Sequence, residues 1–194
     1  VLAEPGKVKW FDAPEPQLVP YGAILKPVAV TPCSSDVHTV FGGGSKKQDN
    51  LVLGHECIAE VVSVGENVCD FKTGDRVAVP AITPDWREKS IQEGNDRHAS
   101  APFSGHQLGR TQPGVFSERF LIKDADTTLA HIPQKISEEQ ALMSVDVVTT
   151  GFTGAEYADI KIGDTVCVIG IGPIGLMAVA GAKLRGAARI IAVG

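Results

Sequence analysis

The sequence predicts a fold of the α/β plus β class, with a β-rich part first and an α/β part after it. Three observations lead to this prediction. Short valine-rich segments bounded by Gly, Pro and Asp occupy residues 7–79, as is typical of β-strands. An apolar, helix-forming segment covers residues 137–155. Residues 164–194 then have the pattern of strand, glycine turn, helix and strand, the order of a parallel βαβ unit.

Composition restricts the possible partners. The 194 residues could form one large domain or one and a half smaller ones, and 43% hydrophobic with 21% charged residues is ordinary for a globular protein. The formal net charge of −5 gives no general attraction to nucleic acid or to an anionic membrane. The first residues contain no apolar core of signal-peptide length, so we expect a cytoplasmic protein.

The cysteines indicate free thiols or ligands rather than a disulfide framework, because no secretion signal is visible. No two of them form a CxxC pair, so a zinc-ribbon or zinc-finger site is unsupported. The cysteines are Cys33, Cys57, Cys69 and Cys167.

The β-rich part is expected to form a small irregular barrel or sandwich. Its predicted strands are KVKWF, GAILKPVAV, IAEVVSVG and DRVAVP. Between them, residues 33–40 (CSSDVHTV) favour a short helical turn, with Ser34 or Ser35 as its N-cap. Residues 41–50 predict a solvated glycine-rich loop, because no strand precedes them and no helix follows, as a phosphate site would require.

A long polar stretch, residues 81–114, is expected to be a loop that has a function or covers an interface. We interpret its two histidines, His98 and His106, as ordinary exposed residues, because neither has a ligand-type neighbour at helical or hairpin spacing. Another strand, VFSERFLI, is predicted after this stretch.

The next predicted element is a helix from about Ser137 through Ala155. Ser137 and Gln140 have the spacing of a capping box. Asp146 lies inside the otherwise apolar run ALMSVDVVTTGF. A carboxylate on such a face needs an ion pair, a hydrogen bond or a metal.

The glycine turn predicts dinucleotide binding. A strand from Thr165 to Ile169 leads into Gly170-x-Gly172-x-x-Gly175, then a helix to about Arg185 and a second strand over 189–193. Gly170 allows the turn, Gly172 leaves room for a pyrophosphate and Gly175 lets the helix lie close to the strand. Pro173 suits the first helical turn, whose free N–H groups attract phosphate. The predicted cofactor contacts are Gly170, Ile171, Gly172, Pro173, Ile174 and Gly175.

Two alternatives remain open for this segment. It has no charged residue between Thr165 and Ala182, so a hydropathy window could indicate a membrane span, although its glycines and proline disfavour one. It could also be a glycine turn that binds no nucleotide. Because a dinucleotide fold needs more than two strands, we expect the working protein to be substantially longer, and the opening Val1 suggests that a short N-terminal piece is absent too. We expect the 194-residue chain by itself neither to bind cofactor nor to turn over.

Candidate chemical groups are scattered along the chain. They are Cys33, His38, the pair His55 and Glu56, and Asp146. Cysteine, histidine and carboxylate form the ligand set of catalytic zinc, which takes three protein ligands and leaves a position open. Spacing alone leaves a buried thiol, a core histidine and a surface acid as the alternative interpretation.

Several long runs carry a resemblance to a known family. The chain resembles the zinc-dependent medium-chain alcohol dehydrogenases, and is most similar to the tetrameric NADP-dependent secondary alcohol dehydrogenases (isopropanol dehydrogenase type) of bacteria and anaerobic protists. The runs are PCSSDVHTVF, LGHE, DFKTGDRVAVPAITPDWR, DVVTTGFTGAE and IGIGPIGLMAVAGAKLRGA. The resemblance covers nearly all of the chain.

The resemblance implies a GroES-like irregular β-barrel catalytic domain over residues 1–147. Residues 148–194 would be the first part of a Rossmann NADP-binding domain, truncated after its second strand. It also implies a homotetramer when full length, with small alcohols or ketones as substrates.

The resemblance further implies roles for individual residues. Cys33, His55 and Asp146 would be zinc ligands, and Glu56 an acidic neighbour able to enter the coordination shell. Ser35 and His38 would relay the proton, with Ser35 close to the substrate oxygen and His38 nearer solvent. Zinc would polarise the oxygen, and histidine suits proton exchange near neutral pH.

The chain departs from the family pattern at two places. The usual family signature has a glycine three residues after the glutamate that corresponds to Glu56, and this chain has Ala59 there. We therefore expect a slightly altered backbone and no loss of metal ligands. Many members hold a structural zinc with four cysteines in the lobe matching residues 81–114. This chain has no cysteine there, so we predict one catalytic zinc and no structural zinc.

The end of the second predicted strand bears on the choice of cofactor. NAD-binding units place an acidic residue about 20 positions after the glycines, where it holds the ribose 2′-OH. Gly194 stands there in this chain. Glycine leaves room for a 2′-phosphate and does not repel it, so NADP is favoured.

The sequence therefore predicts a zinc-dependent NADP(H) oxidoreductase that interconverts secondary alcohols and ketones, and also some aldehydes, by hydride transfer. Two alternatives stay open. One is a zinc-free NADPH quinone or enone reductase on the same scaffold. The other is a non-catalytic nucleotide-binding protein that keeps the fold.

Overall fold

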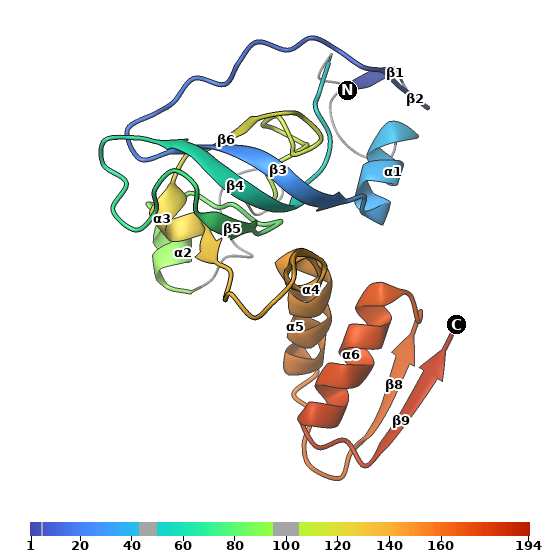
Figure 1. Cartoon of the computed structure of the whole chain (residues 1–194). Helices are drawn as coiled ribbons and strands as arrows, with labels where there is room; N and C mark the ends of the chain where they lie inside the picture. The colour runs from blue at the N-terminus through green and yellow to red at the C-terminus, as the bar shows by residue number, and fades with distance from the viewer. Residues whose placement is uncertain (5, 43–49, 95–104) are drawn as a thin grey trace. The chain divides into compact units, whose positions relative to one another are not determined.

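The chain forms two compact units in the computed structural model, one over Val1–Leu142 and one over Met143–Gly194 (Figure 1). The structure describes residues 1–4, 6–42, 50–94 and 105–194. The first unit is built around one antiparallel sheet. The second contains two helices that pack against each other and a parallel strand pair.

The sheet of the first unit has the strand order β6-β3-β4-β5-β7. The two long strands β3 (Ala23–Thr31) and β4 (Glu56–Val64) pair along their whole length. The shorter strands β5 (Arg76–Val79), β6 (Phe120–Ile122) and β7 (Ala130–His131) extend the sheet on its two sides. Pro27 lies in β3 beside a register shift, where a missing N–H is tolerated.

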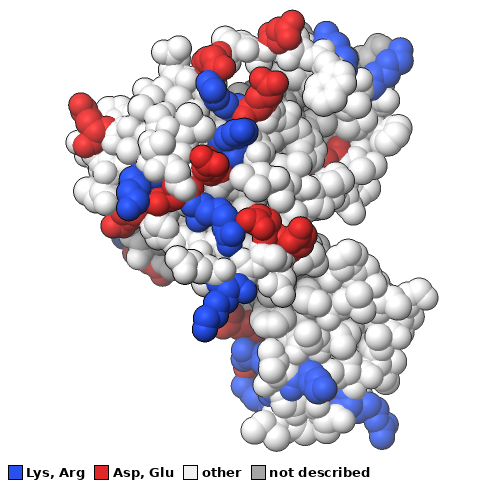
Figure 2. Space-filling model, viewed as in Figure 1, with Lys and Arg blue, Asp and Glu red and all other residues white. Residues whose placement is uncertain are grey.

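Alternating apolar residues of these strands form the core of the first unit. Leu25, Val61, Val77 and Phe120 are almost completely buried, and they pack with Leu108 and Val115 from the connecting segments. Burying each such side chain contributes about 1.5–3 kcal/mol to folding. Acidic and basic side chains are interspersed over the described surface of this unit on the face drawn in Figure 2.

The remaining elements of this unit are short. A small pair, β1 (Leu2–Glu4) and β2 (Lys7–Val8), lies at the N-terminus. Three short helices follow: α1 (Ser34–Val40), α2 (Lys89–Gln92) and α3 (Ala125–Thr128). Most of the predicted glycine loop at 41–50 lies outside the described residues.

Two predicted strands are shorter than expected. Only Lys7–Val8 of KVKWF is a strand, and only Phe120–Ile122 of VFSERFLI. In the latter, the backbone N–H groups of Val115 and Phe116 donate to the carbonyls of Gly54 and Leu53, outside the sheet. Tertiary hydrogen bonds therefore replace the predicted strand pairing there.

The helix predicted over residues 137–155 is present, with an interruption. It consists of α4 (Glu138–Met143), a π-helical turn η2 (Ser144–Val148) and α5 (Thr149–Tyr157). The capping box is confirmed. The Ser137 N–H donates to Gln140 Oε1 at 3.1 Å, and the Gln140 N–H donates to Ser137 Oγ at 3.3 Å.

The second unit confirms the predicted βαβ arrangement. Strands β8 (Thr165–Ile169) and β9 (Arg189–Val193) pair in parallel, with α6 (Pro173–Leu184) between them in sequence. Helix α6 packs against α5 through small residues, since a Cβ added at Gly181 would lie 2.9 Å from the Cβ of Ala155 (Figure 1). Among the described helices, none has the length and apolar character that crossing a membrane requires.

Candidate functional site

The pairing of β3 with β4 brings the first candidate ligands together. Thr31, at the end of β3, is opposite Glu56, at the start of β4. Cys33 follows Thr31 by two residues, and His55 precedes Glu56 by one. Antiparallel register therefore places side chains that are 22 residues apart in sequence at the same end of the sheet.

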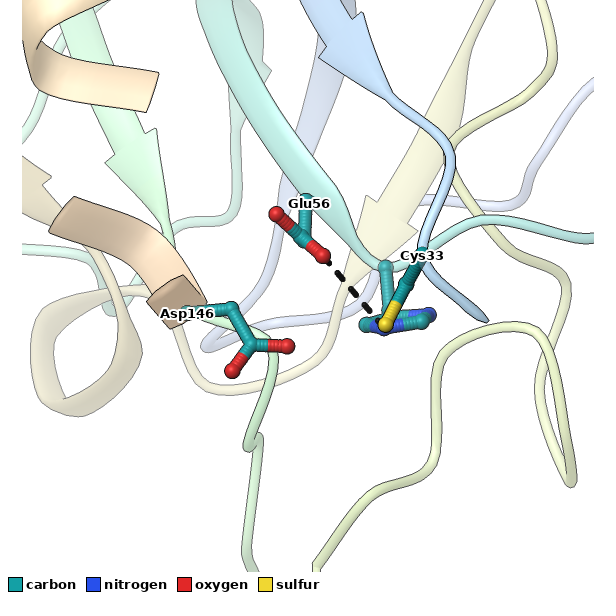
Figure 3. A group of neighbouring side chains, drawn as sticks. Cys33, Glu56 and Asp146 are labelled. Carbon is teal, nitrogen blue, oxygen red and sulfur yellow. Dashed lines mark ion pairs between the residues drawn. The ribbon is translucent and has the colours of Figure 1, made fainter. Parts of the chain in front are cut away.

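Three metal-type donors meet at this end of the sheet. The ligand atoms of Cys33, His55 and Glu56 lie within 4.8 Å of one another. Glu56 and His55 are each 2% exposed, and the Nε2 atom of His55 lies 3.9 Å from Oε1 of Glu56. In Figure 3 the side chains of Cys33 and Glu56 point toward each other, and the dashed line marks the ion pair between His55 and Glu56. Sulfur, imidazole nitrogen and carboxylate oxygen are the donors that zinc prefers, so the residues present fit such an ion.

Asp36 holds the other side of the His55 ring. Its Oδ1 atom lies 3.4 Å from His55 Nδ1, and the side chain is buried. The same carboxylate accepts hydrogen bonds from the backbone N–H groups of Cys33, at 3.0 Å, and Gly54, at 3.2 Å. Asp36 thus connects the segments that carry the thiol and the imidazole.

The charge state of Asp36 determines which nitrogen of His55 can bind a metal. Burial by itself raises the pKa of this carboxyl group. The hydrogen bonds with His55 and with the N–H groups of Cys33 and Gly54 outweigh burial and lower the pKa below its ordinary value. An ionised carboxylate only accepts hydrogen bonds, so a neutral His55 donates from Nδ1 and keeps its lone pair on Nε2. This is the usual arrangement of a metal-binding histidine with its carboxylate partner.

Sequence reasoning did not identify Asp36. The sequence did contain a signal for it. Asp36 lies three residues after Cys33, and an acid at this distance from a helix N-cap often accepts a hydrogen bond from the N-cap backbone N–H. The predicted N-cap was also wrong. Helix α1 is capped by Cys33 and not by Ser34 or Ser35.

Gly54 lets the chain reach this arrangement. Its φ of +92° lies in the left-handed region, which disfavours other residues. An added Cβ would also lie 2.6 Å from the ring of Phe116. The neighbouring Gly114 is close as well, since its Cβ would lie 2.3 Å from the Gly54 carbonyl oxygen. Tight backbone packing therefore fixes the residue before His55.

The predicted relay residues both lie on α1. The Ser35 hydroxyl is 3.5 Å from Nε2 of His55, so it lies beside the candidate metal ligands. His38 is three residues further along the helix and exposed to solvent. Residues at this spacing lie on the same side of a helix.

The interpretation of His106 as an ordinary exposed residue is wrong. Its ring contacts the His55 ring edge-to-face, with centroids 4.4 Å apart. Arg110 donates from Nε to Nδ1 of His106 at 3.3 Å. No local spacing indicated this contact, because it joins segments distant in sequence. His98 lies outside the described residues.

Asp146 belongs to the second unit, and we describe it within that unit. It lies in the π-helical turn η2, where Val145 is buried and Asp146 itself is half-buried. The Thr150 hydroxyl donates to its Oδ1 atom. Asp146 is also drawn in Figure 3.

The glycine turn in the second unit has the geometry of a phosphate cradle. Gly172 caps α6 and Pro173 is its first residue. A Cβ at Gly175 would lie 1.8 Å from the Gly170 carbonyl oxygen, so only glycine allows this close approach of helix to turn. A Cβ at Gly172 would meet nothing within 4 Å, so open space adjoins the helix N-terminus. This turn fits a dinucleotide pyrophosphate.

Gly194 directly follows β9 and lies beside the same turn. A Cβ at this position would lie 2.3 Å from Cγ1 of Ile171, which belongs to the glycine turn. An acidic side chain at 194 would therefore need Ile171 to move.

All four cysteines are free, which confirms the prediction of thiols rather than a disulfide framework. Cys57 is buried, and this burial raises the pKa of its thiol to about 12. Cys69 and Cys167 are exposed.

Known proteins have sequences similar to almost the whole chain. Residues 20–134 match the family model described as alcohol dehydrogenase GroES-like domain. The chain is 56% identical over 189 residues to an NADP-dependent isopropanol dehydrogenase of Thermoanaerobacter brockii, covering 97% of the chain and 54% of that protein. Its identity to an Entamoeba histolytica protein of the same name is 49%, covering 97% and 52%. The chain thus spans about half the length of the curated relatives it matches.

Solved structures with similar folds include two alcohol dehydrogenases. The apo form of zinc dependent alcohol dehydrogenase 2 from Streptococcus pneumonia has a TM-score of 0.86 and 29% identity, covering 98% of this chain and 53% of that one. Alcohol dehydrogenase TADH from Thermus sp. ATN1 has a TM-score of 0.84 and 28% identity, covering 98% and 56%. The chain therefore combines a GroES-like barrel with the start of a Rossmann domain. By its match over residues 20–134, it belongs to the alcohol dehydrogenase GroES-like domain family.

Proposed function

We propose that the protein is a zinc-dependent NADP(H) oxidoreductase that interconverts secondary alcohols and ketones. The observation that carries this proposal is the group formed by Cys33, His55 and Glu56, with His55 oriented by Asp36. The identity to NADP-dependent isopropanol dehydrogenases supports the substrate class.

The proposed zinc ligands are Cys33, His55 and Asp146, with Glu56 as the acidic neighbour. Cys33 and His55 supply the thiolate and imidazole, and Asp146 is assigned by the family resemblance and by its carboxylate in an otherwise apolar segment. When bound, zinc supplies Lewis-acid polarisation of the substrate oxygen, and the nicotinamide supplies or accepts a hydride.

The proton path runs through Ser35 and His38. Ser35 is placed beside His55, so its hydroxyl can exchange a proton with a substrate oxygen held at the metal position. His38 lies on the same helix and is open to solvent, so it can pass the proton to bulk water.

The proposed cofactor contacts lie in the glycine turn and at the end of β9. The N–H groups at the start of α6 and the open space at Gly172 would receive the pyrophosphate. Gly194 supports NADP over NAD, because it offers no carboxylate to hold the 2′-OH or repel a 2′-phosphate. The contacts are Gly170, Ile171, Gly172, Pro173, Ile174, Gly175 and Gly194.

Four further features remain predictions from the family resemblance and composition. These are a catalytic domain over 1–147 with the cofactor domain from 148, a single zinc per subunit, a homotetrameric assembly and a cytoplasmic location. The absence of cysteine from residues 81–114 supports the single zinc.

Metal analysis combined with NADPH oxidation by a small ketone tests the proposal. The intact protein should contain about one zinc per chain. Removing the metal with a chelator should abolish activity, and added zinc should restore it. Cys33→Ser should lose both metal and activity, while Cys69→Ser, at an exposed position, should keep both. Full activity in a metal-free preparation would contradict the zinc mechanism and favour the zinc-free reductase.

A further inference from the structure

The segment that carries Asp146 is a π-helical turn between two α-helices. Residues of η2 (Ser144–Val148) follow α4 and lead directly into α5. A π-turn inserts an extra residue into the helix and changes the direction of the side chains around it, and such turns occur often at functional sites. The turn therefore gives Asp146 an orientation that a regular helix would not.

Two consecutive threonines at the start of α5 bind different parts of Asp146. The Thr149 hydroxyl donates to the Asp146 backbone carbonyl at 2.8 Å. The Thr150 hydroxyl donates to the side-chain oxygen Oδ1. The first bond stabilises the backbone of the turn, whereas the second acts on the carboxylate itself.

The Thr150 contact restricts how Asp146 can coordinate an ion. A carboxylate can bind a cation through one oxygen or through both. A hydroxyl donor at Oδ1 engages one of them, which favours coordination through a single oxygen. It also reduces the rotation of the carboxylate, so less side-chain entropy is lost when an ion binds.

We propose that Thr150 is a positioning residue that fixes the Asp146 carboxylate for single-oxygen coordination of the catalytic metal. This inference rests on the proposed function, because it takes Asp146 as a metal ligand. Partners of this kind, which orient a ligand without touching the metal, typically change metal affinity 10–100-fold when removed.

The test compares three variants of the intact protein by Co²⁺ and Zn²⁺ titration against a competing chelator. Thr150→Val removes the hydroxyl at the carboxylate. Thr149→Val is the matched control, with the same change at the adjacent position and the loss of a bond only to the backbone. Thr150→Ser retains a hydroxyl. Thermal unfolding of the metal-free proteins identifies any general loss of stability.

We expect Thr150→Val to weaken metal affinity about 10–100-fold and to shift the Co²⁺ d–d bands. Thr149→Val should stay within about twofold of the parent affinity, and Thr150→Ser should retain most of it. Equal affinities for Thr150→Val and the parent protein would overturn the inference. Equal weakening by Thr149→Val would also overturn it, because both threonines would then affect metal affinity only by stabilising the helix and not by orienting the carboxylate.

Asp146→Asn separates this inference from the proposed function. If Asp146→Asn weakens metal binding while Thr150→Val does not, the inference fails and the proposed zinc site stands. If the parent protein binds no metal, or Asp146→Asn has no effect, the assignment of Asp146 fails and the inference fails with it.

Discussion

The Nδ1 atom of His55 lies 3.4 Å from Oδ1 of Asp36, and this pair organises the candidate metal site. The lowered pKa of Asp36 keeps the carboxylate ionised, so the imidazole presents Nε2 to the group formed with Cys33 and Glu56. The same carboxylate accepts hydrogen bonds from the backbone N–H groups of Cys33 and Gly54. The orientation of the His55 ring therefore depends on the folding of these two segments.

Asp36→Asn should weaken zinc affinity about 10–100-fold, because an amide is a weaker acceptor for the His55 N–H. Asp126→Asn is the matched control. Asp126 also accepts two backbone hydrogen bonds, from Cys69 and Asp70. Both variants should lose about 1–2 kcal/mol of unfolding free energy, but only Asp36→Asn should change zinc affinity. Equal zinc affinities in the two variants would refute the role of Asp36.

Gly175→Ala should destabilise the second unit by about 1–3 kcal/mol or more, because the new methyl group would overlap the Gly170 carbonyl oxygen. Gly154→Ala, in α5, is the control, since its Cβ would meet nothing within 4 Å. Replacing that helical glycine should stabilise the protein by about 0.5–1 kcal/mol. Thermal unfolding measures both changes, and a neutral Gly175→Ala would argue against the close approach.

In the full-length protein, Gly194→Asp combined with Ile171→Ala should shift cofactor preference from NADPH toward NADH. The acid would accept a hydrogen bond from the ribose 2′-OH and repel a 2′-phosphate, and the smaller residue 171 gives it room. The ratio of kcat/KM for the two cofactors should change at least about tenfold, equivalent to about 1.4 kcal/mol. Gly194→Asp alone should bind both cofactors poorly. An unchanged preference in the double variant would show that specificity lies elsewhere.

The buried thiol of Cys57 should make stability depend on pH in the alkaline range. Its pKa is raised by burial from 9.0 to about 12 in the folded protein. Between these values the unfolded chain releases the proton and the folded chain retains it, so stability falls as pH rises. From pH 8 to pH 10.5 the parent protein should lose about 2 kcal/mol more than Cys57→Ala in urea unfolding. Parallel pH profiles would contradict the assigned pKa.

The second unit was largely predictable because its signals are local. The bounds predicted for Thr165–Ile169 and 189–193 agree with β8 and β9, since alternating apolar strands and a glycine turn act over a few residues. The failure at Val115–Arg119 has the opposite cause. There the backbone bonds to Leu53 and Gly54, and no short window of sequence specifies such partners.

The site was predictable as a set of ligands and not as a geometry. Cys33, His55 and Glu56 were identified in advance, and the register of β3 with β4 explains why they meet. Asp36 and His106 were missed because their roles depend on contacts with His55 across 19 and 51 positions of sequence. The helical interruption at Asp146 was also unexpected, because the pattern around it fits an ordinary α-helix.

Cobalt substitution tests the central claim, that Cys33 and His55 hold a metal ion, most directly. We predict that the Co²⁺-loaded protein shows a thiolate-to-cobalt charge-transfer band. This band should disappear in Cys33→Ser and persist in Cys69→Ser, whose cysteine is exposed and lies outside the site. A protein that binds no cobalt, or a band unchanged by Cys33→Ser, would contradict the account.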